Sequence, residues 1–425
     1  MCKEYTLRVA EYNQPPVFTK GKGSRMWDVN GKEYLDLNSG HMCNILGHSH
    51  PAIVEAITQS CSEFIASTSW YPTEKSIELC ARIAGLVSPP LKPSILISTG
   101  SEAIEVALSI AKKYTGGYEA ASFHISLHGR SSVARTLTPV MGHQGYGPLI
   151  PGIFTMPGPY CYRCPIKLSF PGCNFACLDV GFEMLDRWAM GQVAAIFAEP
   201  VFGAGGIIDA PPGYFKLLKK KCEDRGTLLV FDECQTGLGR CGAMFAYEQE
   251  GIVPDILTMS KTLGGGLPVS STTTSEEIKQ TIMERGFMHS STHAFDPLPS
   301  YAALAVIDTL EKDNLIQQSK EKGDYLKAGF QKLAEQHELI GDIRGRGLFQ
   351  GIELVRDRET REPADRETRQ IHARCMDKGL FFRVTGMAPR KCVLGFSPDY
   401  YITHEEIDKA LNILDDTLSE VEAQT

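Results

Sequence analysis

The sequence Leu-Leu-Val-Phe-Asp-Glu-Cys-Gln-Thr-Gly at residues 228–237 and the sequence Asp-Ile-Leu-Thr-Met-Ser-Lys-Thr-Leu-Gly-Gly-Gly at residues 255–266 indicate the fold most directly. Each begins with a short apolar run, typical of a buried strand, and then turns polar. Asp232 and Lys261 are therefore expected at the C-terminal ends of two strands. In open α/β sheets this edge is where ligands bind.

A third polar motif, Thr99-Gly100-Ser101, follows another apolar strand and opens a helix. Its N–H groups and the helix dipole can hold a phosphate, although a simple N-cap uses the same residue types. Lys261 and Asp232 also have plain alternatives, as a solvated lysine and a capping residue. Together the three motifs suit pyridoxal phosphate, with the lysine as a Schiff base, the acid on the pyridinium nitrogen and the helix end on the phosphate.

Strands and helices alternate along most of the chain, which predicts parallel βαβ crossovers and a sheet covered by helices on both faces. We predict a large α/β domain over residues 61–312. A β-meander at 17–37 with an Asn-Gly turn, and the segments that follow a helical run at 299–339, predict a small α+β domain from residues 1–60 and 313–425. The strands expected in the large domain include 94–98, 121–125, 194–199, 227–231 and 255–260, and the helices 101–113 and 214–225.

Charge and hydropathy exclude several classes of partner. The chain has 425 residues and a net charge of -8, and without a basic run it is not expected to bind nucleic acid or an anionic membrane surface. No stretch reaches the ~18 apolar residues of a membrane span, and the N-terminus lacks a secretory-signal pattern. Most of the 13 cysteines are scattered, which favours reduced thiols. These features predict a cytoplasmic metabolic enzyme.

Four cysteines depart from this scatter: Cys161, Cys164, Cys173 and Cys177 share one loop rich in proline, glycine and tyrosine. Four sulfurs at such spacing can hold a structural zinc ion. The second pair, however, is Cys-x-x-x-Cys and not Cys-x-x-Cys. Ordinary packing of an irregular loop is therefore the favoured interpretation, with a bound metal as the alternative.

Taken together, the motifs resemble the class III aminotransferases, which are fold-type I enzymes that use pyridoxal phosphate, and within that family most resemble the 2,2-dialkylglycine decarboxylases. The resemblance runs nearly from end to end, and the block from Asp232 to Lys261 is specific to the class. It is also carried by Ser39-Gly40-His41-Met42, Leu46-Gly47-His48-Ser49-His50-Pro51, Ser98-Thr99-Gly100-Ser101-Glu102-Ala103, His128-Gly129-Arg130, Glu199-Pro200, Thr292-His293, Asp296-Pro297-Leu298-Pro299 and Gly345-Arg346-Gly347-Leu348.

The resemblance implies roles for individual residues. Lys261 would carry the cofactor and shuttle a proton, Asp232 would pair with the ring nitrogen, and His41 would help to select the bond that breaks at the substrate α-carbon. The implied cofactor-binding set is Thr99, Gly100, Ser101, Leu127, His128, Asp232, Gln235, Lys261 and Thr292 of the partner subunit. Because the family's active site lies between subunits, a homodimer or a dimer of dimers is implied.

The decarboxylases also bind an alkali cation beside the active site. The positions that correspond to its ligands are Ser67, Ser69, Thr292, Ala294 and Asp296. An oxygen-only set with a single carboxylate suits a hard, weakly held ion. The implied cofactors are therefore pyridoxal phosphate and potassium or sodium.

Three positions differ from the decarboxylases. His41 stands where they have glutamine, Leu127 where they have a tryptophan on the cofactor ring, and Gly395 where an arginine forks onto the substrate carboxylate. An arginine makes a bidentate, charge-assisted pair that glycine cannot make. Either a nearby cation replaces it, or the substrate lacks the usual α-carboxylate. The candidate cations are Arg130, Arg390 and Lys391.

The leading functional hypothesis is transamination, simple or linked to decarboxylation, between a small amino acid or amine and a keto acid. The altered pocket leaves racemisation or carbon-carbon bond chemistry as an alternative. A catalytically silent paralogue is the third hypothesis. Lys261 and Asp232 argue against it, because a silent protein does not need a lysine and an acid paired at strand ends.

Overall fold

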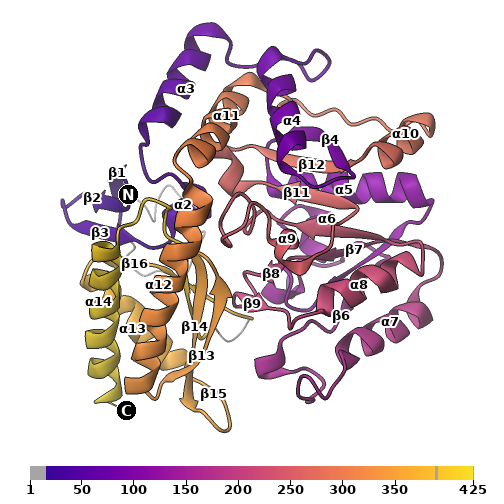
Figure 1. Cartoon of the computed structure of the whole chain (residues 1–425). Coiled ribbons are helices and arrows are strands. Elements are labelled where there is room, and N and C mark those ends of the chain that lie inside the picture. Colours follow the sequence, from indigo (N-terminus) through magenta and orange to yellow (C-terminus); the bar gives the residue numbers. More distant parts are fainter. Residues whose placement is uncertain (1–15, 388–390, 425) are drawn as a thin grey trace.

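The computed structural model describes residues 16–387 and 391–424, and its centre is a seven-stranded sheet (Figure 1). Every strand but β12 runs in the same direction, and β12 is antiparallel to both of its neighbours. In spatial order the strands are β4 (Leu91–Ile97), β12 (Ser270–Ser275), β11 (Ile256–Met259), β10 (Leu228–Asp232), β7 (Val193–Ala198), β5 (Glu119–Phe123) and β6 (Ile153–Met156). The predicted α/β fold with a mostly parallel sheet is confirmed.

Helices cover both faces of this sheet, as its apolar strands require. In β10, Leu228 and Val230 pack in one cluster with α5 (Gly100–Thr115), whereas Leu229 and Phe231 pack in a second cluster with residues of other helices. Successive side chains of a strand point to opposite faces, so both faces of β10 are buried. The other helices of this part are α3 (Pro51–Glu63), α4 (Glu74–Leu86), α6 (Ser132–Thr136), α7 (Ala176–Trp188), α8 (Tyr214–Glu223), α9 (Ala246–Glu250), α10 (Glu276–Glu284) and α11 (Pro297–Lys312).

Strand β12 has no apolar residue, although all six of its residues are buried. Most of its hydroxyl groups are paired: the Thr272 hydroxyl donates to Ala103 O, the Thr274 hydroxyl to Asp255 O, and Thr273 and Ser94 share a hydrogen bond of 2.7 Å. Ser271 Oγ has no partner in the described part of the chain. Such pairing offsets most of the cost of burying polar groups. The strand between β4 and β11 therefore carries no hydrophobic periodicity.

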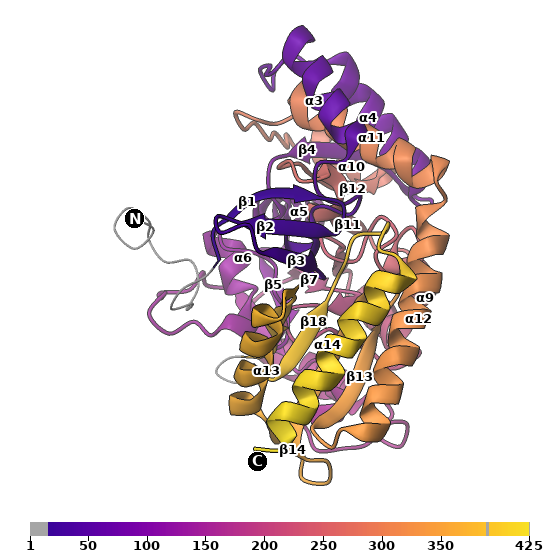
Figure 2. The same cartoon turned by 90° about the vertical axis from the view of Figure 1, so that its left-hand side faces the viewer.

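Two smaller sheets form the remainder of the molecule. One has the order β13 (Ile340–Arg346), β14 (Phe349–Asp357), β18 (Val393–Phe396), β17 (Arg383–Thr385), with β15 (Glu362–Pro363) on β14. The other has the order β1 (Phe18–Lys22), β2 (Arg25–Asp28), β3 (Glu33–Asp36), β16 (Leu380–Phe381), so that N- and C-terminal segments share a sheet (Figure 2). The helices of this part are α12 (Leu315–Gln336), α13 (Asp365–Asp377) and α14 (His404–Glu422), and the remaining short elements are α2 (Ser39–Met42), β8 (Val201–Phe202) and β9 (Ile208–Asp209).

The single helical run expected at 299–339 is instead two helices, α11 and α12. The break lies at Asn314, whose φ is 50° and which precedes the first residue of α12. Asparagine tolerates this left-handed conformation better than most residues. Apolar periodicity continues across the break, and this is why the pattern alone does not reveal it.

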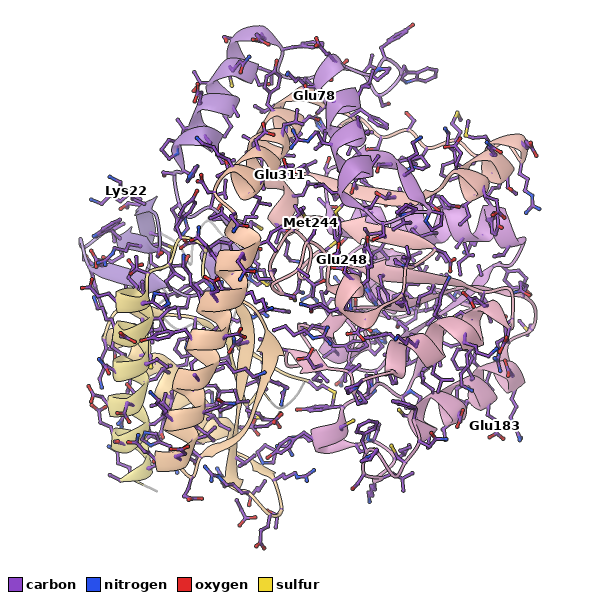
Figure 3. All side chains as sticks on the ribbon, in the orientation of Figure 1. Lys22, Glu78, Glu183, Met244, Glu248 and Glu311 are labelled. Carbon is purple, nitrogen blue, oxygen red and sulfur yellow. The ribbon has the colours of Figure 1, made fainter. Side chains whose placement is uncertain are left out.

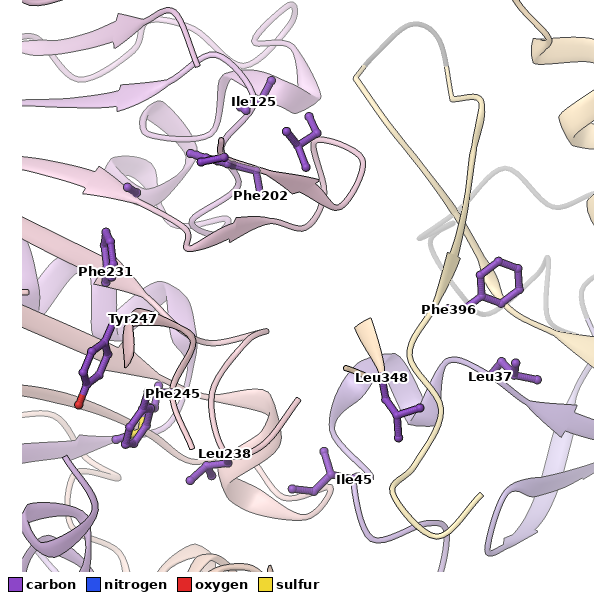
Figure 4. Close-up of a cluster of buried hydrophobic side chains, with 14 of the residues drawn as sticks. Leu37, Ile45, Ile125, Phe202, Phe231, Leu238, Phe245, Tyr247, Leu348 and Phe396 are labelled. Carbon is purple, nitrogen blue, oxygen red and sulfur yellow. The ribbon is translucent and has the colours of Figure 1, made fainter. Parts of the chain in front are cut away.

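One hydrophobic core connects the two parts. Phe231 and Phe202 near the large sheet belong to the same buried cluster as Leu348 and Phe396 near the smaller one (Figure 4). Charged residues such as Glu183 lie at the periphery (Figure 3). Among the described residues, no helix combines the length and apolarity needed to cross a bilayer.

Candidate active site

A cavity of about 420 Å³ opens at the C-terminal edge of the large sheet. It is lined by residues at or shortly after the ends of β4, β5, β7, β10 and β11, and these strand ends meet at one edge because the strands are parallel. The lining includes Ser98, Thr99, Gly100, Ser101, Leu127, His128, Gly129, Arg130, Glu199, Asp232, Cys234, Gln235, Ser260 and Lys261. The structure thus brings most of the predicted cofactor-binding residues together.

Asp232 is held by a fixed set of donors on the floor of this cavity. His128 Nδ1 donates to Asp232 Oδ2 at 2.8 Å, and the backbone N–H of Cys234 donates to Oδ1 at 3.1 Å. Burial acts to raise the pKa of the Asp232 carboxyl, but the hydrogen bond and the charge of His128, with the charge of Lys261, outweigh it and lower the pKa. The group is therefore a carboxylate at neutral pH, fit to pair with a cationic ring nitrogen.

Lys261 enters the same cavity at the end of β11, at the first residue of a short 3-10 helix, Lys261–Gly264. The turn that follows contains Gly265 and Gly266, with φ values of 55° and 106°. A Cβ atom on Gly266 would lie 2.6 Å from Asn44 Oδ1. The positive φ of Gly266 therefore favours glycine, and the Asn44 side chain packs into the space that a Cβ would need.

The beginning of α5 forms a cup beside Lys261. The Thr99 hydroxyl accepts a hydrogen bond from Glu102 N, whereas the first N–H groups of any helix have no partner within the helix. Ser101 Oγ accepts from the backbone N–H of Arg130 at 2.9 Å, which ties the two cavity-lining loops together. The cup thus offers backbone donors at a positive helix end, as a phosphate requires.

The cavity also holds polar atoms that have no partner among the residues that the structure describes. Two such atoms, Gln235 Oε1 and His128 Nε2, are buried and accept or donate no hydrogen bond there. Unpaired buried polar atoms are costly, so they indicate a polar ligand. With the Asp232 carboxylate, the Lys261 amine and the α5 cup, they form a donor and acceptor set that fits pyridoxal phosphate.

Glu199 is a buried acid that directly follows β7. It accepts hydrogen bonds from Leu127 N at 2.8 Å and from Gly203 N at 3.1 Å. Burial raises the pKa of the Glu199 carboxyl to about 7, and the charge of Asp232 acts in the same direction. Through its hydrogen bond to Leu127 N, Glu199 fixes the loop that carries Leu127.

His41 lies in a left-handed turn between the two parts of the molecule. Ser39, Gly40, His41 and Met42 all have positive φ values, from 42° to 69°. Asp36 supports this turn, because its carboxylate accepts from the backbone N–H groups of Ser39 and Gly40. Such conformations cost roughly 1–2 kcal/mol per non-glycine residue, and they cluster at functional sites.

The electrostatics of His41 connect it to the cavity. Although part of His41 is exposed to solvent, burial lowers the pKa of its imidazole to about 4, and the charges of Arg383 and Lys261 lower it further. His41 is therefore neutral at physiological pH. Its ring lies within electrostatic range of both cations.

The three cations considered as replacements for an arginine at Gly395 are placed differently. Arg130 lines the cavity but is exposed. Lys391 is exposed, its backbone N–H donates to Asp365, and it does not line the cavity. Arg390 lies outside the described residues. Sequence reasoning missed Arg383, which is paired with Gly395 across two strands.

The positions implied for an alkali cation are partly assembled. Asp296 Oδ1 accepts from the backbone N–H of Ser67 at 3.2 Å, and Asp296 Oδ2 contacts His293 Nδ1 at 2.6 Å. Ala294 is buried, Thr292 is exposed and Ser69 is hydrogen-bonded to Ser290. The cation site stays a prediction.

The four cysteines of the loop differ in their exposure. Cys161 is exposed and Cys164, Cys173 and Cys177 are half-buried. Burial raises the pKa of Cys177 to about 11, and the other three thiols act in the same direction. No group of three or more cysteine, histidine or acidic side chains in the described part of the chain is arranged to hold a metal ion. Both interpretations of the loop, packing and a bound metal, stay predictions.

Comparison with known proteins identifies the family. The model of the family "Aminotransferase class-III" matches residues 7–418. The chain therefore belongs to the class III aminotransferases, enzymes that depend on pyridoxal phosphate.

Among the relatives, an uncharacterised aminotransferase of Schizosaccharomyces pombe is 38% identical, over 95% of this chain and 91% of its own. A leucine/methionine racemase of Thermococcus litoralis is 34% identical, over 96% and 91%. A crystal structure of a Bacillus anthracis aminotransferase superposes with a TM-score of 0.93 at 28% identity, over 99% of this chain and 97% of that one.

Proposed function

We propose that this protein transfers an amino group between a small amino acid and a keto acid through pyridoxal phosphate bound to Lys261. The observation that carries the proposal is the cavity in which Lys261 faces the Asp232–His128 pair and the α5 cup. Relatives called aminotransferase and racemase match over more than nine tenths of the chain. The branch of the family to which this chain belongs is a finer question that the test below addresses.

Residues that line the cavity would each have a role in binding the cofactor or in moving a proton. Gly100 and Ser101 would hold the phosphate, and Gln235 would donate from its side-chain Nε2 to the phenolic oxygen. When bound, the cofactor supplies an electron sink for charge that develops at the substrate α-carbon. Asp232 would keep the ring nitrogen protonated, because its low pKa makes it an anion. Lys261 would accept and return the α-proton.

Racemisation is the second candidate, and the observation behind it is the relative from Thermococcus litoralis, named a leucine/methionine racemase. Racemisation and transamination begin with removal of the same α-proton, and they differ in where the proton returns. Decarboxylation-linked transamination would instead break the bond to the carboxylate. His41 occupies the position that would select among these outcomes, and it is neutral in this structure.

One experiment separates the three reactions. The purified protein with pyridoxal phosphate is incubated with enantiopure alanine and 2-oxoglutarate, with enantiopure leucine and either pyruvate or 2-oxoglutarate, and with the achiral 2-aminoisobutyrate and either keto acid. From alanine and leucine we expect a new keto acid in proportion to the amino acid consumed. Inversion of configuration without keto acid would indicate a racemase, and release of carbon dioxide in step with amino transfer would indicate the decarboxylase branch.

We also propose that the active form is a homodimer, or a dimer of dimers, in the cytoplasm. Large apolar side chains are exposed near the predicted cation loop: Trp70 is 77% exposed, Tyr71 73% and Met288 84%. Exposed apolar residues in such numbers commonly mark an interface. Burial of this surface in a second copy would bring Thr292 of the partner subunit to the phosphate.

The proposed potassium or sodium site gives a test by ion exchange. We expect activity to differ by about tenfold, equivalent to ~1.4 kcal/mol, between potassium, sodium, lithium and tetramethylammonium at constant ionic strength. Asp296→Ala should remove this dependence, because it deletes the only carboxylate of the set. Asp308→Ala is the matched control, since Asp308 is an acid of α11, the helix that follows Asp296, and it pairs with Arg82. Equal rates in all four ions would contradict the site.

A further inference from the structure

Arg383 lies beside Gly395, the position at which the decarboxylases have their carboxylate-binding arginine. Strands β17 and β18 are antiparallel, and Arg383 is the direct cross-strand partner of Gly395. A Cβ atom added to Gly395 would lie 2.9 Å from Arg383 Nε and 3.0 Å from Arg383 Cγ. The Arg383 side chain therefore crosses the face of Gly395 and fills the space where a side chain of residue 395 would begin.

The backbone of Gly395 does not itself demand glycine. Its φ lies outside the left-handed region, and the next atom near an added Cβ is Ile207 Cδ1 at 3.4 Å, an ordinary contact. Of the three atoms nearest to an added Cβ, the two that crowd it belong to Arg383. A side chain at 395 would therefore begin in the volume that the Arg383 side chain occupies.

The guanidinium of Arg383 is held in place but is not satisfied. Nη1 donates to Met42 Sδ at 3.4 Å, and the group lies over the ring of Phe349, 5.2 Å from its centroid. Nε and Nη2 are buried with no hydrogen-bond partner in the described part of the chain. Arg240, by comparison, donates to the carbonyl of Leu348 and to the Ser39 hydroxyl, and only its Nε has no partner in the described part of the chain. A buried guanidinium with two free donors is costly unless an anion completes it.

Arg383 does not itself line the cavity, but its neighbours connect it to residues that do. Its charge, like that of Lys261, acts on His41, so both cations lie within electrostatic range of one imidazole. The Phe349 ring beneath it approaches Gly203, as does the Gln235 amide that lines the cavity. Burial lowers the pKa of Arg383 to about 10, and the charge of Arg240 adds to this effect, but the group remains a cation at neutral pH.

We propose that Arg383 binds the α-carboxylate of the substrate, so that the carboxylate fork has moved from β18 to the neighbouring position of β17. The substrate class is then an ordinary small α-amino acid and its keto acid, and Gly395 does not mark a substrate without a carboxylate. This inference rests on the proposed function, because it assigns the substrate of that same cavity.

The test measures binding, and so does not depend on turnover. Isobutyrate and its neutral isostere isobutyramide are titrated by calorimetry into the protein loaded with pyridoxal phosphate. We expect the wild-type protein to prefer the carboxylate, and Arg383→Gln to weaken isobutyrate binding by about 30-fold or more while isobutyramide binding stays unchanged. Arg374→Gln, the same substitution at an arginine of α13 that pairs with Glu420, should bind both ligands as the wild type does.

A double variant that moves the arginine from position 383 to position 395 distinguishes loss of carboxylate binding from loss of folding. Arg383→Ala combined with Gly395→Arg should recover carboxylate preference, because residue 395 then has the space that Arg383 leaves. Gly395→Arg alone should unfold at a lower temperature than the wild type, since two guanidinium groups would share one volume. Preference for isobutyrate that survives in Arg383→Gln, or that is lost in Arg130→Gln instead, would overturn the proposal.

Failure of the proposed function would look different. If Lys261 forms no covalent adduct with the cofactor, amino transfer is wrong, yet carboxylate binding at Arg383 is still measurable. For each substrate, the rate of the half-reaction in Arg383→Gln is divided by the rate in the wild type. If amino transfer occurs and this ratio is the same for alanine and for isopropylamine, which lacks a carboxylate, only the carboxylate assignment is wrong.

Discussion

Lys261→Ala is expected to abolish amino transfer, with a loss of roughly 10⁴-fold, the upper end for removal of a proton-transfer group. The reason is that Lys261 is the only lysine among the described residues that line the cavity of the large sheet. The cofactor itself should still bind, because the α5 cup and Asp232 are unchanged. Reduction with borohydride followed by peptide mass analysis should place the cofactor on Lys261 in the wild type and on no residue in the variant.

Lys219→Ala is the control for this experiment, since Lys219 pairs with Asp255 just before β11 and does not line the cavity. It should keep both the adduct and the activity. Mapping of the adduct to any other lysine in the wild type would refute the assignment of Lys261.

Asp232→Asn should lower the rate by about a hundredfold or more, which corresponds to roughly 3 kcal/mol in the barrier. A neutral amide cannot keep the ring nitrogen protonated, so the electron sink weakens. The fold should persist, because asparagine has nearly the same shape as aspartate and can still accept from the backbone N–H of Cys234. Single-turnover absorbance measurements with alanine give the rate, and thermal unfolding verifies the fold.

His128→Ala offers a graded comparison. It removes the hydrogen bond that lowers the pKa of Asp232 but leaves the carboxylate in place, so its loss of rate should be smaller than that of Asp232→Asn. A rate for Asp232→Asn within a few-fold of wild type would show that the acid does not pair with the ring.

Strand ends were predictable because each of the strands that carry Asp232 and Lys261 is a short apolar run followed by polar residues. Asp232 and Lys261 could be placed at one edge for this reason, and the structure brings them together with Gly100 and Glu199. Strand β12 could not be predicted, because its six buried residues are all serine or threonine. The hydroxyls of Thr272 and Thr273 pair with residues far along the chain, and such pairing leaves no mark on hydropathy.

Arg383 escaped prediction for a related reason. It lies well before Gly395 in the sequence, and only the antiparallel register of β17 and β18 makes the two direct neighbours. Arg390 and Lys391 are closer along the chain, yet Lys391 is exposed beside Asp365. Proximity in sequence is a poor guide to proximity across a hairpin, because the register decides which side chains meet.

The shared volume of residues 383 and 395 also constrains how such an enzyme evolves. A protein with arginine at one position cannot reach the other arrangement by independent steps without loss, since one intermediate carries two crowded guanidinium groups and the other carries none. The pair is therefore expected to be epistatic, with each substitution harmful alone and tolerated together. In a phylogenetic tree the two substitutions should therefore occur together. Relatives with glycine at position 395 should have arginine at the facing position of the adjacent strand.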